Sequence, residues 1–232
     1  PPPLPGFDWH DAPPSHCFVF KGLQRANWLQ ATEGEIDPAH LSYLHCYLTD
    51  EIDDDSSYGF DQYLEPAGDT GVAVTRLFRE IPNPRLEVEA TDFGARIYAL
   101  RDAGNFMHVR VTNFVFPNAA VVAIRDWSLV QIHVPIDDVS NWRYDIFYSF
   151  GTPIDHATLM RERLNSYDVP SYSPKRNHSN RYGFSSAEQK SGTFAGVGYD
   201  FNVHDTMILE GAGSIQDRTK EHLGYTDRPI IA

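Results

Sequence analysis

The chain has 232 residues, of which 41% are hydrophobic and 13% aromatic, as in a globular protein large enough to bury a sizeable core. Its 19 basic and 32 acidic residues give a formal net charge of -13, which argues against nucleic-acid binding, because that depends on lysine and arginine. No apolar run approaches the roughly 18 residues of a membrane span, and the two cysteines, Cys17 and Cys46, are too few for a disulfide framework. We therefore expect no nucleic-acid or membrane partner and a reducing, cytoplasmic location.

The first 16 residues are rich in proline, which favours an extended, semi-rigid backbone of the kind found in linkers. We predict a linker over 1–16 and one domain over 17–232, and the linker suggests that a further domain precedes this one.

Residues 23–48 have helical spacing in two pieces, divided near residues 34–38. Asp37 suits the N-cap of the second piece and Pro38 its first turn. The acidic cluster that follows, at residues 50–55, is interpreted as a solvated loop.

A block of strands follows, rich in β-branched and aromatic residues and divided by turn-forming residues. The predicted strands cover residues 72–75, 86–91, 95–100, 107–116, 121–124, 129–134 and 144–150. Their short connections favour antiparallel pairing. We predict helices at 155–163 and over part of 203–223, so the fold class is α+β, an antiparallel sheet of about seven strands covered by helices.

The spacing Asp37-x2-His40-x4-His45 indicates a possible metal site. Two neutral imidazoles suit Fe(II), Zn(II), Cu(II) or Ni(II), and an added carboxylate gives the donor set of non-haem iron oxygenases. An ideal helix would rotate residues five apart by about 140°. Both histidines can therefore reach one metal only if the helix tightens, ends or contains a π-bulge between them. Two half-buried histidines on an amphipathic helix are the alternative interpretation.

Two long stretches, Asn27–His45 and Phe201–Asp227, together resemble Rieske non-haem iron aromatic-ring oxygenases. The resemblance is to the phthalate dioxygenase and aryl-ether O-demethylase branch, and the two stretches come in the family's order around the strand block. It implies the catalytic, C-terminal domain of an alpha subunit, with a helix-grip (START/Bet v 1-like) fold. The implied reaction is O2-dependent cis-dihydroxylation or O-demethylation of an aromatic substrate.

The resemblance also implies roles for individual residues. It places Asp37 as a carboxylate that bridges His40 to a Rieske-cluster histidine of the neighbouring subunit, and Asn27 as a polar residue near the iron. Such a carboxylate behind a ligating imidazole fixes its tautomer. The implied ligands of a mononuclear Fe(II) are His40, His45 and Asp205, with Asp200 and Glu210 as alternative carboxylates.

Members of this branch often act on aromatic carboxylates, which arginine binds through two hydrogen bonds. Three arginines of the strand block are candidate substrate-binding residues, although each could face outward instead: Arg96, Arg101 and Arg110. His204, next to Asp205, is a candidate for the pocket wall. His133 falls in a predicted strand, which favours a core or pocket position over metal ligation.

Neither Cys17 nor Cys46 has the histidine partner of a Rieske motif, so the [2Fe-2S] cluster is expected on a domain absent from this chain. The implied partners are O2, an aromatic substrate, and a ferredoxin or flavin reductase that passes electrons from NAD(P)H. The implied assembly is a homotrimer or stacked trimers.

Two other functions remain open. A helix-grip protein that carries a hydrophobic ligand without catalysis would differ in metal content. A zinc hydrolase would need a water-activating glutamate beside the histidines, which the zincin pattern has and this stretch lacks.

Overall fold

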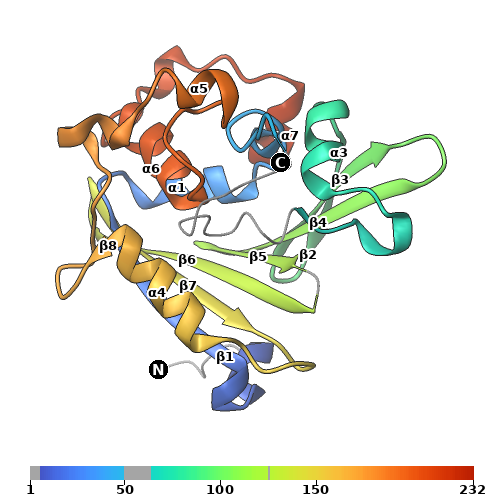
Figure 1. Ribbon diagram of the computed structural model, residues 1–232, viewed down its shortest axis with the longest axis horizontal. Helices are drawn as coiled ribbons and strands as arrows, with labels where there is room; N and C mark the ends of the chain where they lie inside the picture. Colours follow the sequence, from blue (N-terminus) through green and yellow to red (C-terminus); the bar gives the residue numbers. More distant parts are fainter. Residues whose placement is uncertain (1–5, 50–63, 125) are drawn as a thin grey trace.

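A seven-stranded antiparallel sheet, in the order β1-β7-β6-β5-β4-β3-β2, forms the centre of the molecule (Figure 1). The computed structural model describes residues 6–49, 64–124 and 126–232, so the acidic cluster at 50–55 lies outside the described residues. The strands are β1 (Cys17–Gln24), β2 (Arg85–Thr91), β3 (Gly94–Asp102), β4 (Met107–Val115), β5 (Ala119–Ile124), β6 (Trp127–Asp137) and β7 (Ser140–Tyr148). The predicted α+β class and antiparallel pairing are confirmed.

Helices cover one face of this sheet. In the order of the chain they are α1 (Trp28–Ile36), α3 (Val74–Glu80), α4 (His156–Ser166), α5 (Glu188–Ser191), α6 (Phe201–Gly211) and α7 (Arg228–Ile231). The 3-10 turns are η1 (Asp8–Asp11), η2 (Pro14–His16), η3 (His40–Ser42), η4 (Gly68–Thr70), η5 (His178–Gly183), η6 (Arg218–Lys220) and η7 (Tyr225–Asp227), and β8 (Tyr167–Asp168) pairs with β9 (Ser173–Pro174). Helix α1 packs on β4, β5 and β6, whereas α4 packs on β1 (Figure 1).

One predicted strand is wrong, and one strand was not predicted. Residues 72–75 lead into α3, in which Val74, Leu77 and Phe78 share a face. Leu77 and Phe78 are each 2% exposed, so burial of this face outweighs the strand preference of the β-branched residues before it. The unpredicted strand is β1, which begins in the apolar run at 17–20 and pairs with β7 over its full length.

The helix predictions are confirmed at 155–163 and, for 203–223, over α6 and η6. The helical pattern at 23–48 was read too broadly, because its first residues belong to β1 and its second piece is only the turn η3. The division between the two pieces is where it was predicted, since α1 ends at Ile36.

The covered face of the sheet carries several buried or half-buried polar groups. Register pairs Arg101 with His108 and Arg110 with Ala99, and pairs His133 with Arg143, all on this face. The opposite face is apolar near its centre, where Trp9 and Ala12 pack against a cluster formed by Val130, Ile146 and Tyr148.

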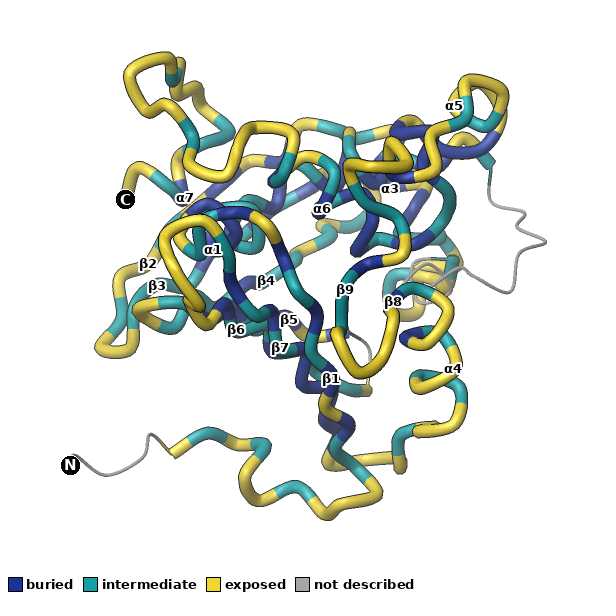
Figure 2. The backbone as a smooth tube through the Cα atoms, turned by 90° about the vertical axis from the view of Figure 1, so that its left-hand side faces the viewer, coloured by how far each residue is buried: buried dark blue, intermediate teal, exposed yellow. Residues whose placement is uncertain are grey.

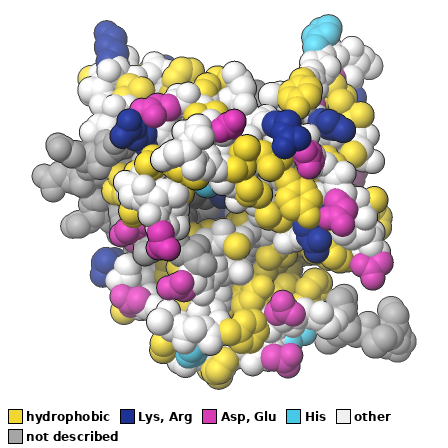
Figure 3. Space-filling view, turned by 90° about the vertical axis from the view of Figure 1, so that its right-hand side faces the viewer, with side chains coloured by type: hydrophobic (Ala, Val, Ile, Leu, Met, Phe, Trp, Pro, Cys, Tyr) yellow, Lys and Arg dark blue, Asp and Glu magenta, His cyan; other side chains and the backbone are white. Residues whose placement is uncertain are grey.

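Two side views show which parts of the chain are buried and which kinds of side chain lie on the surface. The strands β5 and β7 are mostly buried, and the connecting loops are mostly exposed (Figure 2). On the face shown in Figure 3, charged and apolar side chains are interspersed and the surface is hollowed near its middle. No helix in the described part of the chain is long and apolar enough to cross a membrane.

Candidate metal centre

Helix α6 presents three functional side chains on one face. Asp200 caps its N-terminus by accepting a hydrogen bond from the backbone N–H of Asn202 at 2.9 Å. From this fixed start, Phe201, His204 and Asp205 follow at the i, i+3 and i+4 spacing that puts side chains on one side of a helix. All three contact the ring of His45, which lies 159 residues before His204 in the chain.

The segment after α1 brings His40 and His45 together because the helix ends. The carboxylate of Asp37 accepts hydrogen bonds from the backbone N–H groups of Ala39 at 2.7 Å and His40 at 3.2 Å. The chain then makes the single turn η3 and leaves helical geometry at Tyr43. Residues five apart can share a metal if the helix tightens, ends or contains a π-bulge between them. In the structure, the helical turn ends between His40 and His45.

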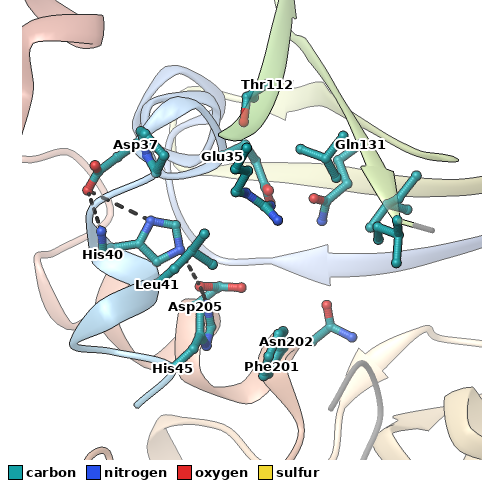
Figure 4. Close-up of a pocket in the computed structure, with 15 residues that line it drawn as sticks. Glu35, Asp37, His40, Leu41, His45, Thr112, Gln131, Phe201, Asn202 and Asp205 are labelled. Atoms are coloured by element: carbon teal, nitrogen blue, oxygen red, sulfur yellow. Dashed lines mark hydrogen bonds and ion pairs between the residues drawn. The ribbon is translucent and has the colours of Figure 1, made fainter. Parts of the chain in front are cut away.

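His40, His45 and Asp205 converge on one point (Figure 4). Asp205 Oδ1 lies 3.0 Å from His45 Nε2 and 3.8 Å from His40 Nε2. One donor atom from each residue fits within 4.8 Å of the others, which no other group of three His, Cys, Asp or Glu residues achieves among those the structure describes. Two imidazoles and one carboxylate suit a divalent transition metal.

The electrostatics of the three residues agree with a cation site. Burial would raise the pKa of Asp205, but His45 and His40 together hold it well below its usual range. Burial lowers the pKa of His45, against the pull of the Asp205 carboxylate. Both effects favour an ionised Asp205 carboxylate beside a neutral His45 imidazole, and those are the forms that bind a metal.

Two rings of α6 hold the ring of His45. It stacks on Phe201 at 4.4 Å between centroids and on His204 at 5.2 Å. Burial and the neighbouring His45 lower the pKa of His204 to about 4, so His204 is neutral and carries one ring proton.

Two backbone carbonyls compete for the ring proton of His204. The carbonyl of Gly198 lies 2.7 Å from Nε2, and that of Leu44 lies 3.0 Å from Nδ1. The shorter contact favours a proton on Nε2 of His204. Its Nδ1 then accepts from His45 Nδ1 at 3.2 Å, which leaves His45 Nε2 unprotonated toward Asp205.

Asp37 lies behind His40, on the side away from Asp205. Its Oδ2 atom is 3.8 Å from His40 Nδ1, which is an ion-pair distance and longer than a hydrogen bond. Asp37 borders the pocket with the three converging donors and also a surface groove between α1, α6 and residues 216–230. It therefore connects the converging donors with the outside of the molecule.

The pocket at these donors has two walls. The helix wall comes from α6 and from the segment after α1, and it contains the three donors together with Asp37, Phe201 and Asn202. The sheet wall comes from β4, β5 and β6, and contains Arg110, Thr112, Val122, Ile124, Leu129 and Gln131. Sequence reasoning missed Asn202, whose position three residues before Asp205 on one helix was the available signal.

The arginines predicted to bind substrate separate into three environments. Arg96 lies on the outer face of the sheet, where it bonds Asn113 and pairs with Glu89. Arg101 is buried and donates to Ser42 Oγ at 2.9 Å, outside the pocket, and burial with nearby Arg110 lowers the pKa of Arg101 to about 10. Arg110 alone of the three lines the pocket.

The remaining candidates lie away from the pocket. Asn27 is the N-cap of α1: its Oδ1 accepts from Leu29 N–H at 3.0 Å and its Nδ2 donates to the Asp138 carbonyl at 2.8 Å. His204 supports His45 from behind and does not line the pocket. The alternative carboxylates are engaged elsewhere, Asp200 as the cap of α6 and Glu210 with the hydroxyl of Tyr182.

Comparison with known proteins gives a consistent family. A family profile described as "LigXa C-terminal domain like" matches residues 2–232. The phthalate 4,5-dioxygenase oxygenase subunit of Pseudomonas putida is 31% identical over 95% of this chain and 50% of its own length. The 3-chlorobenzoate-3,4-dioxygenase oxygenase subunit of Comamonas testosteroni is 27% identical over 99% of this chain and 54% of its own length.

The chain therefore spans about half the length of the curated relatives that it matches. Among solved structures, the terminal oxygenase of carbazole 1,9a-dioxygenase from Nocardioides aromaticivorans IC177 is similar at a TM-score of 0.48 and 13% identity, over 100% of this chain and 61% of that one.

Proposed function

The chain belongs to the LigXa C-terminal domain-like family, and on that premise we propose that it is the iron-binding catalytic domain of a Rieske-type oxygenase for an aromatic substrate. The observation that carries the proposal is the convergence of His40, His45 and Asp205 at the edge of a pocket. Two histidines and one carboxylate occupy one side of an iron ion and leave positions for O2 and substrate. Iron bound there would supply the activation of O2 for attack on the substrate.

The residues around the three ligands orient them. His204 sets the tautomer of His45, and Phe201 stacks on that ring. Asp37 orients His40 from behind. Asp37 also borders the surface groove, and this position suits the passage of an electron from a Rieske [2Fe-2S] domain of a neighbouring subunit.

We assign the substrate to the aromatic carboxylates. Arg110 is the one lysine or arginine among the described residues that line this pocket, and apolar side chains such as Leu41, Val122 and Leu129 line part of it. A guanidinium in a pocket with apolar side chains would orient a ring that bears a carboxylate. The outcome is cis-dihydroxylation or O-demethylation.

The same proposal includes the partners. Electrons come from NAD(P)H through a ferredoxin or flavin reductase, and the protein is a cytoplasmic homotrimer or stacked trimer. The bridging role of Asp37 supports a trimeric assembly, because it requires a cluster domain from another subunit at the groove.

Metal content and a substrate probe test the proposal. The purified protein should retain about one iron per chain, and His40→Ala should retain none. With Co(II) in place of iron, phthalate should change the visible spectrum of the metal. Arg110→Met should weaken that response by at least about tenfold, while the control Arg96→Met, on the outer face of the sheet, should not. A protein that binds phthalate but no metal would instead be a ligand carrier.

A further inference from the structure

A second histidine–carboxylate pair, Glu35 and His133, lies beside the pocket, and of the two only Glu35 borders it. Glu35, near the end of α1, borders the pocket of the metal donors (Figure 4) and also an apolar cavity between α1 and α6. Its Oε1 atom lies 3.5 Å from Nε2 of His133 on β6. The His133 side chain is fully buried, and that of Glu35 is 15% exposed.

The other ring nitrogen of His133 is fixed by Asn141. The amide nitrogen of Asn141 donates to the backbone carbonyl of Ala26 at 2.9 Å, and a carbonyl can only accept. The amide oxygen of Asn141 is therefore the atom that faces His133 Nδ1 at 3.2 Å. Because this oxygen accepts, Nδ1 of His133 carries a hydrogen.

A neutral His133 with its hydrogen on Nδ1 would point the lone pair of Nε2 at the Glu35 carboxyl. His133 Nε2 is buried and has no hydrogen-bond partner among the described residues. Two acceptors 3.5 Å apart leave no room for a water molecule on the line between them. An unsatisfied buried acceptor facing a carboxylate costs on the order of 1–3 kcal/mol, and one shared proton removes that cost.

We propose that Glu35 and His133 share one proton, and that Glu35 is the residue that delivers it to the pocket. This inference rests on the proposed function. Both candidate reactions consume one O2, two electrons from NAD(P)H and two protons. In dihydroxylation the O–O bond breaks, two C–O bonds form, and each oxygen gains a proton. In O-demethylation one oxygen leaves as water and formaldehyde is released.

When the shared proton lies on Glu35 Oε1, rotation of the carboxyl away from His133 breaks the contact with Nε2, and Glu35 supplies this proton as one of the two. The pair then recovers its proton from water in the pocket. His133 does not border the pocket and acts through Glu35, so it is a positioning residue that stores the proton.

Other charged groups surround the pair on each side. Across the register of β6 and β7, His133 faces Arg143, whose neighbour on the same face is Asp145. From β4 and α6, Arg110 and Asp205 border the same pocket as Glu35, as does Asp37 beyond the end of α1. Both His133 and Glu35 therefore have cations and anions near them. The shared proton can lie on either residue without leaving an isolated buried charge.

The shared proton can be observed without turnover. Solid-state NMR of Zn(II)-loaded protein, labelled with 15N in histidine and 13C in glutamate, reads both partners at pH 7. His133→Gln and Glu35→Gln assign the signals by difference. We expect either His133 Nε2 or the Glu35 carboxyl to be protonated. A bare Nε2 together with an ionised Glu35 in the wild-type protein would overturn the proposal, whether or not the variants fold.

Turnover tests delivery separately. In the complete oxygenase system with phthalate, Glu35→Gln should keep its iron but lower product formation by about 10²–10⁴-fold, the range of general acid catalysis, and Glu35→Asp should recover part of it. Full activity in Glu35→Gln would refute delivery by Glu35. Absence of iron from the wild-type protein would refute the oxygenase assignment, and the NMR result would stand apart from it.

Discussion

Two histidine–carboxylate pairs lie at or beside the pocket, but they differ in what lies around them. On the helix wall, His45 Nε2 is 3.0 Å from Asp205, and a second imidazole, His40, points at the same carboxylate. In the other pair, His133 Nε2 on β6 is 3.5 Å from Glu35 on α1, and no second histidine donor joins them among the described residues.

The comparison shows how the surroundings decide the chemistry of a histidine–carboxylate pair. Three donors that converge can hold a metal, because each contributes a lone pair to one point. Two partners alone can share a proton. In both pairs the far ring nitrogen is fixed by a further residue, His204 behind His45 and Asn141 behind His133.

Substitutions in each pair should distinguish the metal site from the second pair most directly. Asp205→Asn and His45→Ala should abolish retention of iron, because either change leaves fewer than three converging donors. Glu35→Gln is the matched control, since it changes a carboxylate of the same pocket and should leave the iron content unaltered. Metal analysis after anaerobic loading and gel filtration measures both. Loss of iron from Glu35→Gln would show that Glu35 is itself a ligand.

The sheet also carries a carboxylate whose partners are cations instead of histidines. Asp145 is buried and bonds Arg163 at 2.6 Å, with Arg143 at 3.3 Å. Asp145→Asn would leave two buried guanidiniums without this anion, so we expect a loss of about 3–5 kcal/mol in the free energy of unfolding. Urea denaturation measures this loss, and the folded fraction should still bind iron.

An exposed ion pair provides the control for that loss. Arg76 and Glu80 pair at 2.8 Å, and both side chains are more than half exposed. Glu80→Gln should change the free energy of unfolding by less than about 1 kcal/mol, because water screens the pair. Equal effects of Asp145→Asn and Glu80→Gln would mean that the buried cluster adds nothing to stability.

His204 sharpens the comparison on the helix wall. His204→Phe keeps a ring against His45 but removes the nitrogen that accepts from His45 Nδ1. We expect the affinity for Co(II) to fall by about 10–100-fold, as when a partner behind a metal-binding histidine is lost. Titration of the metal-free protein with Co(II) measures the change. An unchanged affinity would mean that His204 contributes only its stacked ring.

The sequence predicted the helix wall better than the sheet wall, for a physical reason. The spacing of Asp37, His40 and His45 is local, and the convergence with Asp205 could be expected from two long stretches that resemble one family in order. The end of the helix after Ile36 was also marked, because Asp37-Pro38 both caps a turn and interrupts a helix.

The sheet wall depends on register, which the local pattern does not contain. Arg96, Arg101 and Arg110 have equivalent local contexts in predicted strands, yet they face the outside, the core and the pocket, respectively. A shift of one residue in pairing would exchange the two faces. The pairing of Glu35 with His133 is of the same kind, since it joins α1 to β6 across the packed core.

Asn27 was placed near the iron by resemblance, whereas its contacts in the structure are those of a helix cap, and a substitution separates the two roles. Asn27→Ala removes the hydrogen bonds to Leu29 and Asp138, so the free energy of unfolding should fall by about 1 kcal/mol. Asn27→Asp keeps the cap and should lose less. Iron content should stay unchanged in both, because α1 separates Asn27 from His40. Loss of iron from folded Asn27→Ala would show that Asn27 does contribute to the metal centre.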